Sequence, residues 1–172
     1  LIIGAPYADP SGNSAAGVSY VVFGHASGFG TLNLATLNGS DGFKISGEAA
    51  GDVSGYAASS AGDVNGDGFA DLIIGADNAS PNGVTHAGAS YVVFGAASGF
   101  GANLNLSTLN GANGFKINGE AAGDKSGHSV SAAGDVNGDG FADLLIGAYR
   151  ADPNGASSGA SYVVFGQAGG FT

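Results

Sequence analysis

Cysteine, methionine and tryptophan are absent from this sequence of 172 residues, and only four residues are lysine or arginine. Without cysteine, the chain has neither disulfide bonds nor thiol chemistry. Four scattered basic residues do not form the clusters that bind nucleic acid or an anionic membrane surface. No apolar run approaches the ~20 residues of a membrane-spanning helix. The sequence therefore predicts neither nucleic-acid binding nor membrane insertion.

Acidic residues are plentiful, and the net charge is −10. Six of the aspartates lie in two copies of one nonapeptide, Asp-Val-Asn-Gly-Asp-Gly-Phe-Ala-Asp, three in each copy. The copies occupy residues 63–71 and 135–143. Carboxylates packed this closely repel one another unless a cation compensates, and alternate oxygens on a glycine-softened turn suit Ca²⁺. Two bound Ca²⁺ ions would change the net charge from −10 to −6. The predicted side-chain ligands, at positions 1, 3, 5 and 9, are Asp63, Asn65, Asp67 and Asp71, then Asp135, Asn137, Asp139 and Asp143.

Other interpretations of the nonapeptide are weaker. An EF-hand loop needs a bidentate glutamate at position 12, where this chain has Ile74 and Ile146 inside apolar runs. Mg²⁺ demands stricter octahedral geometry, and Zn²⁺ prefers cysteine and histidine ligands. A metal-free turn stays the alternative, because Asp, Asn and Gly are common turn residues. The identical second copy favours metal.

The whole chain is built on a repeat. Leu1–Ala5 returns as Leu72–Ala76 and Leu144–Ala148, at spacings of 71 and 72 residues, and many of the 34 glycines recur at fixed places. Short β-branched and aromatic runs bounded by glycine predict strands, with no sustained helical period. We expect at most single helical turns near Leu32–Leu37 and Leu104–Leu109.

Four strands in each repeat predict an all-β fold of β-propeller blades. Residues 1–53 form a partial blade, residues 54–125 a complete blade with the first calcium loop, and residues 126–172 a partial blade with the second. Two periods and a remainder cannot close a ring of about 4–8 blades. We expect either further blades in a longer chain, or copies that associate through unpaired blade edges.

Three connections vary most between the copies: Pro6–Gly17, Asp77–Gly88 and Tyr149–Gly159. Variable loops on a constant frame are where binding specificity usually lies. These loops are therefore the expected site for an extracellular protein or glycan ligand.

The stretch Gly62–Ala76, Gly-Asp-Val-Asn-Gly-Asp-Gly-Phe-Ala-Asp-Leu-Ile-Ile-Gly-Ala, resembles the FG-GAP repeat. That repeat builds the seven-bladed propeller of integrin α subunits and of many bacterial extracellular proteins. The resemblance implies a Ca²⁺ loop between the first two strands of a blade. It also implies that the carbonyls of Phe69 and Phe141 are ligands and that their rings enter the core. Ser54-Gly55 and Ser126-Gly127 replace the leading Phe-Gly, which favours a bacterial-type protein over an integrin.

Catalytic residues are not evident. The acidic pairs Glu48/Asp52 and Glu120/Asp124 recur and suit either a paired-carboxylate site or an interblade turn, and we favour the turn. The histidines His25, His86 and His128 occupy unrelated repeat positions. We therefore predict a non-enzymatic, calcium-binding module of a secreted or cell-surface protein, with an adhesive, structural or protein-binding role. The alternatives are a propeller scaffold or carbohydrate-binding module attached to a secreted hydrolase, and a self-assembling filament subunit.

Overall fold

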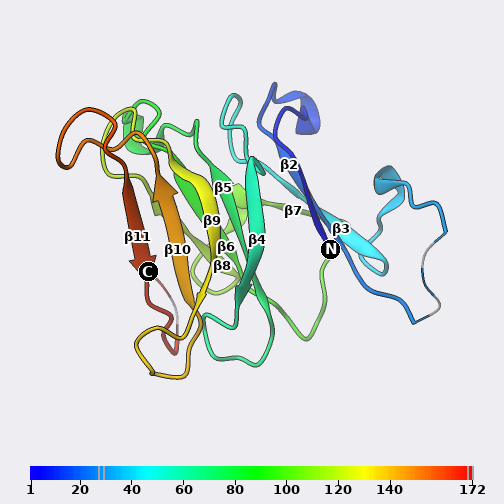
Figure 1. Ribbon diagram of the computed structural model, residues 1–172. Coiled ribbons are helices and arrows are strands. Elements are labelled where there is room, and N and C mark those ends of the chain that lie inside the picture. Colours follow the sequence, from blue (N-terminus) through cyan, green and yellow to red (C-terminus); the bar gives the residue numbers. More distant parts are fainter. Residues whose placement is uncertain (27, 29, 170, 172) are drawn as a thin grey trace.

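A computed structural model shows three β-sheets arranged side by side, which we call sheets A, B and C (Figure 1). The structure describes residues 1–26, 28, 30–169 and 171. The sheets follow one another along the chain, from sheet A near the N-terminus to sheet C near the C-terminus. The fold is all-β, as predicted, and the three sheets do not close a ring.

Sheet B has the four-stranded antiparallel form expected of a propeller blade. Its strands are β4 (Ala57–Gly62), β5 (Asp71–Ala76), β6 (Ala89–Val93) and β8 (Gly114–Asn118), paired in that order. The apolar runs form its two middle strands because both of its faces are covered, one by sheet A and the other by sheet C.

Sheet A contains three antiparallel strands and one strand that the sequence did not predict. The antiparallel strands are β1 (Ile2–Ala5), β2 (Val18–Val22) and β3 (Gly42–Ser46). The fourth, β7 (Asn103–Asn105), belongs to the connection between β6 and β8 of sheet B and pairs in parallel with β3. The chain thus leaves sheet B, joins sheet A, and returns.

Sheet C consists of β9 (Ser126–Gly134), β10 (Asp143–Ala148) and β11 (Ala160–Val164), all antiparallel. Strand β9 runs beside β4 of sheet B (Figure 1). Strand β9 also approaches β5 closely: a Cβ atom on Gly75 of β5 would lie 1.9 Å from the carbonyl oxygen of Gly127. This close approach explains the small residues of the inner strands.

Two apolar clusters hold the sheets together. Phe43, Ile45, Ile74 and Tyr91 lie in the cluster between sheets A and B. Ile73, Val92, Leu144 and Ile146 lie in the one between sheets B and C. All eight side chains are essentially buried, so burial of apolar surface is the main force that joins the sheets.

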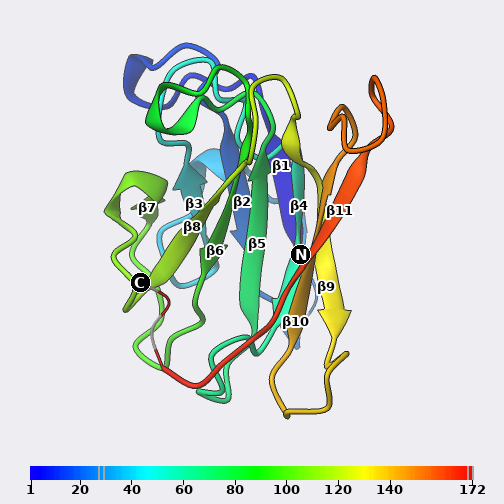
Figure 2. The ribbon, with the colours of Figure 1, turned by 90° about the vertical axis from the view of Figure 1, so that its left-hand side faces the viewer.

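Two phenylalanines outside the strands stack on rings of a neighbouring sheet: Phe100, which follows β6, stacks on sheet A, and Phe171, which follows β11, stacks on sheet B. The ring of Phe100 lies 4.1 Å from that of Phe43, and the ring of Phe171 lies 4.0 Å from that of Phe115, both nearly parallel. Figure 2 shows the C-terminal segment crossing from β11 towards β8 to make the second contact. These stacked pairs fasten neighbouring sheets to each other beyond the strand pairing.

Within the described residues, four single 3-10 turns lie in the connections between strands. The turns at Leu34–Thr36 and Leu106–Thr108 lie where single helical turns were expected. Those at Pro10–Gly12 and Pro81–Gly83 were not expected. Both begin with a proline, whose fixed φ favours the first helical position.

The connections separate into two groups by position. Both nonapeptide loops lie at the lower end of the molecule in Figure 1, between the first and second strands of sheets B and C. The three variable connections lie at the opposite, upper end. A metal at the lower end would therefore support the sheets without occupying the variable loops.

Candidate metal centres

The first nonapeptide joins β4 to β5, and the second joins β9 to β10. Position 12 of each copy, Ile74 or Ile146, lies within a strand, as predicted. Each loop bends through two glycines with positive φ: 76° and 87° at Gly66 and Gly68, and 77° and 93° at Gly138 and Gly140. L-residues rarely adopt this region, so the glycines at positions 4 and 6 are required by the backbone.

The aspartate at position 1 organises the first loop. Its Oδ1 atom accepts hydrogen bonds from the N–H groups of Gly66 (2.8 Å) and Asp67 (3.1 Å), and its Oδ2 atom accepts one from Gly68 (2.9 Å). The side chain of Asp67 in turn accepts from Phe69 N–H at 2.9 Å. The loop backbone therefore wraps around its own acidic side chains.

The second loop repeats this arrangement bond for bond. Asp135 accepts from Gly138, Asp139 and Gly140 at 2.7, 3.0 and 2.9 Å. Asp139 accepts from Phe141 at 2.9 Å. Identical bonds in different surroundings show that the nonapeptide itself dictates the loop conformation.

The aspartate at position 9 has a structural role that the sequence did not reveal. Asp71 is fully buried and accepts from Val64 N–H (2.8 Å) and Gly95 N–H (2.8 Å), which ties the loop to the end of β6. Asp143, also fully buried, binds Val136 and Gly166 in the same way. Burial raises the pKa of Asp71 above its usual range against those two hydrogen bonds, and the charges of Asp67 and Asp63 raise it further.

The donor set suits a hard cation, although the carboxylates are not gathered around one point. Among the described residues, no group of three His, Cys, Asp or Glu side chains is arranged to hold a metal ion. The loop oxygens are instead turned to backbone N–H groups. An ionised carboxylate has about four acceptor sites, so these bonds leave lone pairs for a metal. The carbonyl oxygens of Phe69 and Phe141 accept no hydrogen bond within the described part of the chain.

The two phenylalanines of the loops do not behave alike. The expectation that both rings enter the core is wrong for Phe69, whose side chain is 41% exposed. Phe141 is half-buried and its ring lies against the first loop, where a Cβ atom on Gly66 would come within 2.3 Å of its Cε1 atom. Phe141 is therefore partly covered by the first nonapeptide loop, which lies beside its ring.

A backbone bond also connects the two loops. The N–H group of Ala142 donates to the carbonyl oxygen of Asp63 at 2.9 Å, and that of Gln167 donates to Val64 at 3.0 Å. The second loop thus rests directly on the first.

The recurring acids have structural roles, as favoured from the sequence, and the two glutamates make contacts between sheets. Glu48 of sheet A accepts from Tyr91 Oη (2.5 Å) and Lys116 Nζ (2.6 Å) of sheet B. Burial raises the pKa of Glu48, but the hydrogen bonds from Lys116 and Tyr91 outweigh it, and the net pKa is lowered. Glu120 likewise accepts from Tyr162 at 2.8 Å. The aspartate that follows has a different role, since Asp52 accepts from Ala49 N–H at 3.2 Å.

One histidine joins an aromatic group at the upper end, which sequence reasoning missed. The centroid of the His128 ring lies 4.8 Å from that of Tyr56 and 4.3 Å from that of Tyr149. The Nδ1 atom of His128 lies 2.8 Å from Asp77 Oδ2. Tyr56 and Tyr149 are 47% and 45% exposed. The rings come from both sheets B and C, so sequence spacing gave no sign of their proximity.

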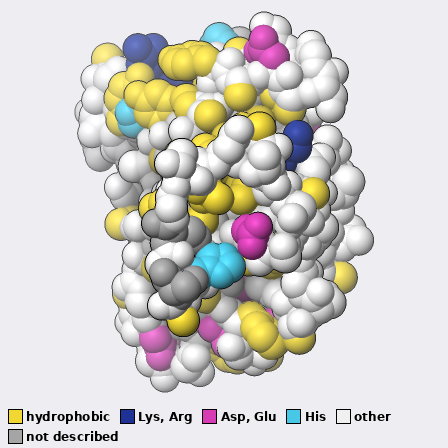
Figure 3. Space-filling model, turned by 90° about the vertical axis from the view of Figure 1, so that its right-hand side faces the viewer, with side chains coloured by type: hydrophobic (Ala, Val, Ile, Leu, Met, Phe, Trp, Pro, Cys, Tyr) yellow, Lys and Arg dark blue, Asp and Glu magenta, His cyan; other side chains and the backbone are white. Residues whose placement is uncertain are grey.

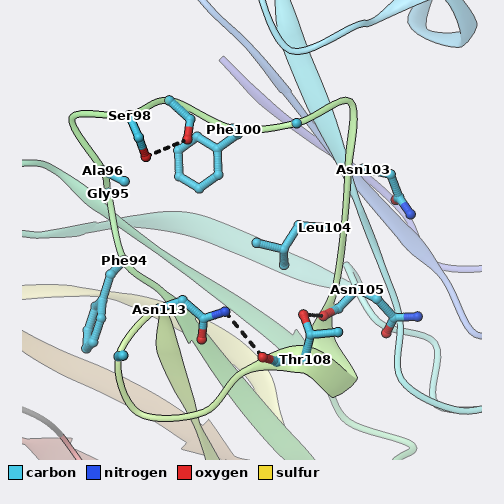
Figure 4. Close-up of a pocket in the computed structure, with 13 residues that line it drawn as sticks. Phe94, Gly95, Ala96, Ser98, Phe100, Asn103, Leu104, Asn105, Thr108 and Asn113 are labelled. Atoms are coloured by element: carbon cyan, nitrogen blue, oxygen red, sulfur yellow. Dashed lines mark hydrogen bonds between the residues drawn. The ribbon is translucent and has the colours of Figure 1, made fainter.

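A hollow of about 500 Å³ lies inside the connection between β6 and β8 (Figure 4). Its walls include Phe94, Phe100 and Leu104, and none of its lining residues is charged. Asn113 Nδ2 donates to the Thr108 carbonyl oxygen, and Thr108 Oγ1 donates to the Asn105 carbonyl oxygen. These polar groups therefore make hydrogen bonds within the connection. The hollow is a product of the excursion to sheet A.

A family model described as the FG-GAP repeat matches residues 54–93 and residues 126–164. Each match contains one nonapeptide loop and the first three strands of its sheet. A search of curated proteins finds no match. FG-GAP repeats are typical of extracellular proteins and of structural or interaction modules rather than enzymes. No helix in the described part of the chain is long and apolar enough to cross a membrane.

Proposed function

Starting from a chain that is an FG-GAP repeat protein, we propose that it is a non-enzymatic binding module whose two nonapeptide loops each hold one Ca²⁺ ion. The ion stabilises the sheets, and the variable loops at the opposite end contact an extracellular protein or glycan. The module then serves adhesion or the structure of a secreted or cell-surface protein.

The observation that carries this proposal is the identical wrapping of both loops around their acidic side chains. Asp63 and Asp67 direct their oxygens inward to one short stretch of backbone, and Asp71 is buried below them. Three carboxylates so close in sequence favour a bound cation because it cancels their repulsion. When bound, Ca²⁺ supplies charge compensation and cross-links the loop to the strand that begins at Asp71.

Isothermal titration with CaCl₂ tests this proposal. The expected stoichiometry is two ions per chain for the wild type and one for either Asp67→Ala or Asp139→Ala. Asp9→Ala is the matched control, because Asp9 is an exposed aspartate that also accepts a backbone N–H bond, from Ala15 at 2.7 Å. Absence of binding, or binding that survives both substitutions together, would show that the loops are metal-free turns.

Carbohydrate binding is a second candidate, favoured by the aromatic group Tyr56, His128 and Tyr149. Exposed aromatic rings offer flat apolar surfaces with polar edges, which suit the faces and hydroxyl groups of a sugar. Arg150 lies over the Tyr149 ring at 5.3 Å and adds a hydrogen-bond donor. A module of this kind would sit beside a secreted hydrolase. Binding to a glycan array that Tyr149→Ala abolishes would support it, and an array without signal would contradict it.

A further inference from the structure

A polar hollow of about 480 Å³, which we call the A–B hollow, lies between sheets A and B at the upper end of the molecule in Figure 1. One wall is the connection from β3 to β4, residues 48–52. The other is the variable connection from β5 to β6, through residues 78–82 and His86, and Lys116 of β8 completes the lining. The volume is within the range of about 300–1,000 Å³ that is typical of small-molecule sites.

The charged groups of the A–B hollow are held in place by one another. Glu48 Oε2 accepts hydrogen bonds from Tyr91 Oη and Lys116 Nζ, and the Lys116 ammonium also lies 5.3 Å from the centre of the Tyr91 ring. Both bonds use the same carboxylate oxygen, so within the described residues Oε1 of Glu48 and the other N–H groups of Lys116 are free to bind a ligand. A ligand in the hollow thus meets an acceptor and a donor whose positions are fixed.

The other polar groups around the A–B hollow have few partners. Asp52 accepts one hydrogen bond, from Ala49 N–H at 3.2 Å. Burial raises the pKa of Asp52 above its usual range against that bond, and the charge of Glu48 raises it further. Among the described residues, the side chains of Asn82 and His86 have no hydrogen-bond partner. A ligand that donates a hydrogen bond to Asp52 would therefore stabilise its ionised form.

The mixture of groups indicates a neutral ligand with several hydroxyl groups. The carboxylates accept hydrogen bonds, the Lys116 ammonium and the Asn82 amide donate them, and a sugar hydroxyl can do both. An anion would be repelled by Glu48 and Asp52, and a cation by Lys116. Three alanines and Pro81 add small apolar surfaces that suit the C–H groups of a sugar ring. Seen from the side of sheet A, the upper end carries acidic, basic and histidine side chains (Figure 3).

The fold builds a matching hollow between sheets B and C, which we call the B–C hollow. Its volume is about 290 Å³, and its lining includes Glu120, Asp124 and Asp152. The first two occupy the repeat positions of the acids of the A–B hollow, but Asp152 stands where the A–B hollow has Ser80. A carboxylate in place of a hydroxyl removes a donor and adds charge, so the B–C hollow is less suited to a neutral ligand.

We propose that the A–B hollow binds one neutral sugar unit of an extracellular glycan. This inference rests on the proposed function, since it gives the variable end of the module a ligand class and a site. Asp52 and Glu48 accept hydrogen bonds from the sugar hydroxyls, and Lys116 and Asn82 donate to them. The site differs from the aromatic group around His128, whose rings come from sheets B and C.

An NMR titration with the methyl glycosides of glucose, galactose, mannose and N-acetylglucosamine tests the proposal, in buffer that contains CaCl₂. At least one glycoside is expected to shift the amide signals of residues 48–52 and 78–86. Asp52→Asn keeps the size of the side chain and an acceptor oxygen but loses the charge, so it should weaken binding about tenfold or more. His86→Ala truncates an exposed side chain of the lining and should also weaken binding. Asp124→Asn, at the repeat position of Asp52, is the matched control and should bind as the wild type does.

Three results would overturn the proposal. The first is that none of the glycosides shifts these signals, even near its solubility limit. The second is that binding is unchanged in both Asp52→Asn and His86→Ala. The third is that Tyr149→Ala abolishes binding, which would place the sugar on the aromatic group.

A separate calcium titration of each variant distinguishes failure of this site from failure of the proposed metal centres. Two bound ions without glycoside binding would overturn the sugar site alone. Glycoside binding that depends on Asp52, in a chain that binds no calcium, would support the sugar site and overturn the metal centres.

Discussion

The two nonapeptide loops have the same sequence and the same hydrogen bonds but different surroundings. The first loop is covered: its Val64 is fully buried, and the Phe141 ring lies on its Gly66. The second loop is open: its Val136 is 56% exposed, and a Cβ atom on Gly138 would meet no atom within 4 Å. The sequence of a loop thus sets its shape, and the neighbouring sheet sets how firmly that shape is held.

The largest expected effect concerns position 9, where the two loops should not differ. Asp71→Ala and Asp143→Ala each leave two backbone N–H groups unsatisfied, one of them buried. Each unsatisfied buried group costs about 1–3 kcal/mol, so we expect each variant to lose about 3 kcal/mol or more of unfolding free energy. Urea denaturation measures both losses. A loss below that of an ordinary surface substitution would contradict the anchoring role.

The next largest effect, the loss of stability when the glycine at position 4 is replaced, should differ between the two loops. Gly138→Ala places a side chain at positive φ and should destabilise the fold by about 1–2 kcal/mol. Gly66→Ala adds a clash with Phe141, for a further ~1–3 kcal/mol. The Gly66→Ala/Phe141→Ala double variant should recover this further loss, which a double-mutant cycle in urea measures. Equal losses for Gly66→Ala and Gly138→Ala would show that the cover is unimportant.

Calcium affinity should differ least. The covered loop is held in place before the ion arrives, and preorganisation lowers the entropy that binding must overcome. We expect the first loop to bind Ca²⁺ a few times more tightly than the second. Titration of Asp139→Ala reports the first loop alone, and titration of Asp67→Ala reports the second. The reverse order of affinities would contradict the influence of the cover.

Local features could be predicted from the sequence because local chemistry determines them. Glycine-bounded apolar runs predicted the strands, and two of the 3-10 turns lie where single helical turns were expected. The positions of Gly66 and Gly68 in the nonapeptide gave its bend. The two turns that begin at Pro10 and Pro81 were missed, although the prolines were visible.

Features that depend on neighbouring sheets could not be predicted. Strand β7 joins sheet A because a connection of sheet B happens to pass it, and nothing in Asn103–Asn105 records that partner. Phe69 and Phe141 have the same local sequence and different exposure. Asp71 was expected only as a ligand, since its bond to Gly95 spans 24 residues.

Thermal unfolding in CaCl₂ and in excess EGTA, followed by circular dichroism, tests the central claim most directly. An ion at 100 times its Kd stabilises the folded chain by about 2.7 kcal/mol per site. We therefore expect the Tm to fall by several degrees in EGTA, and to fall less for Asp67→Ala or Asp139→Ala, which retain one site each. Superimposable melting curves of the wild type in CaCl₂ and EGTA would contradict the account.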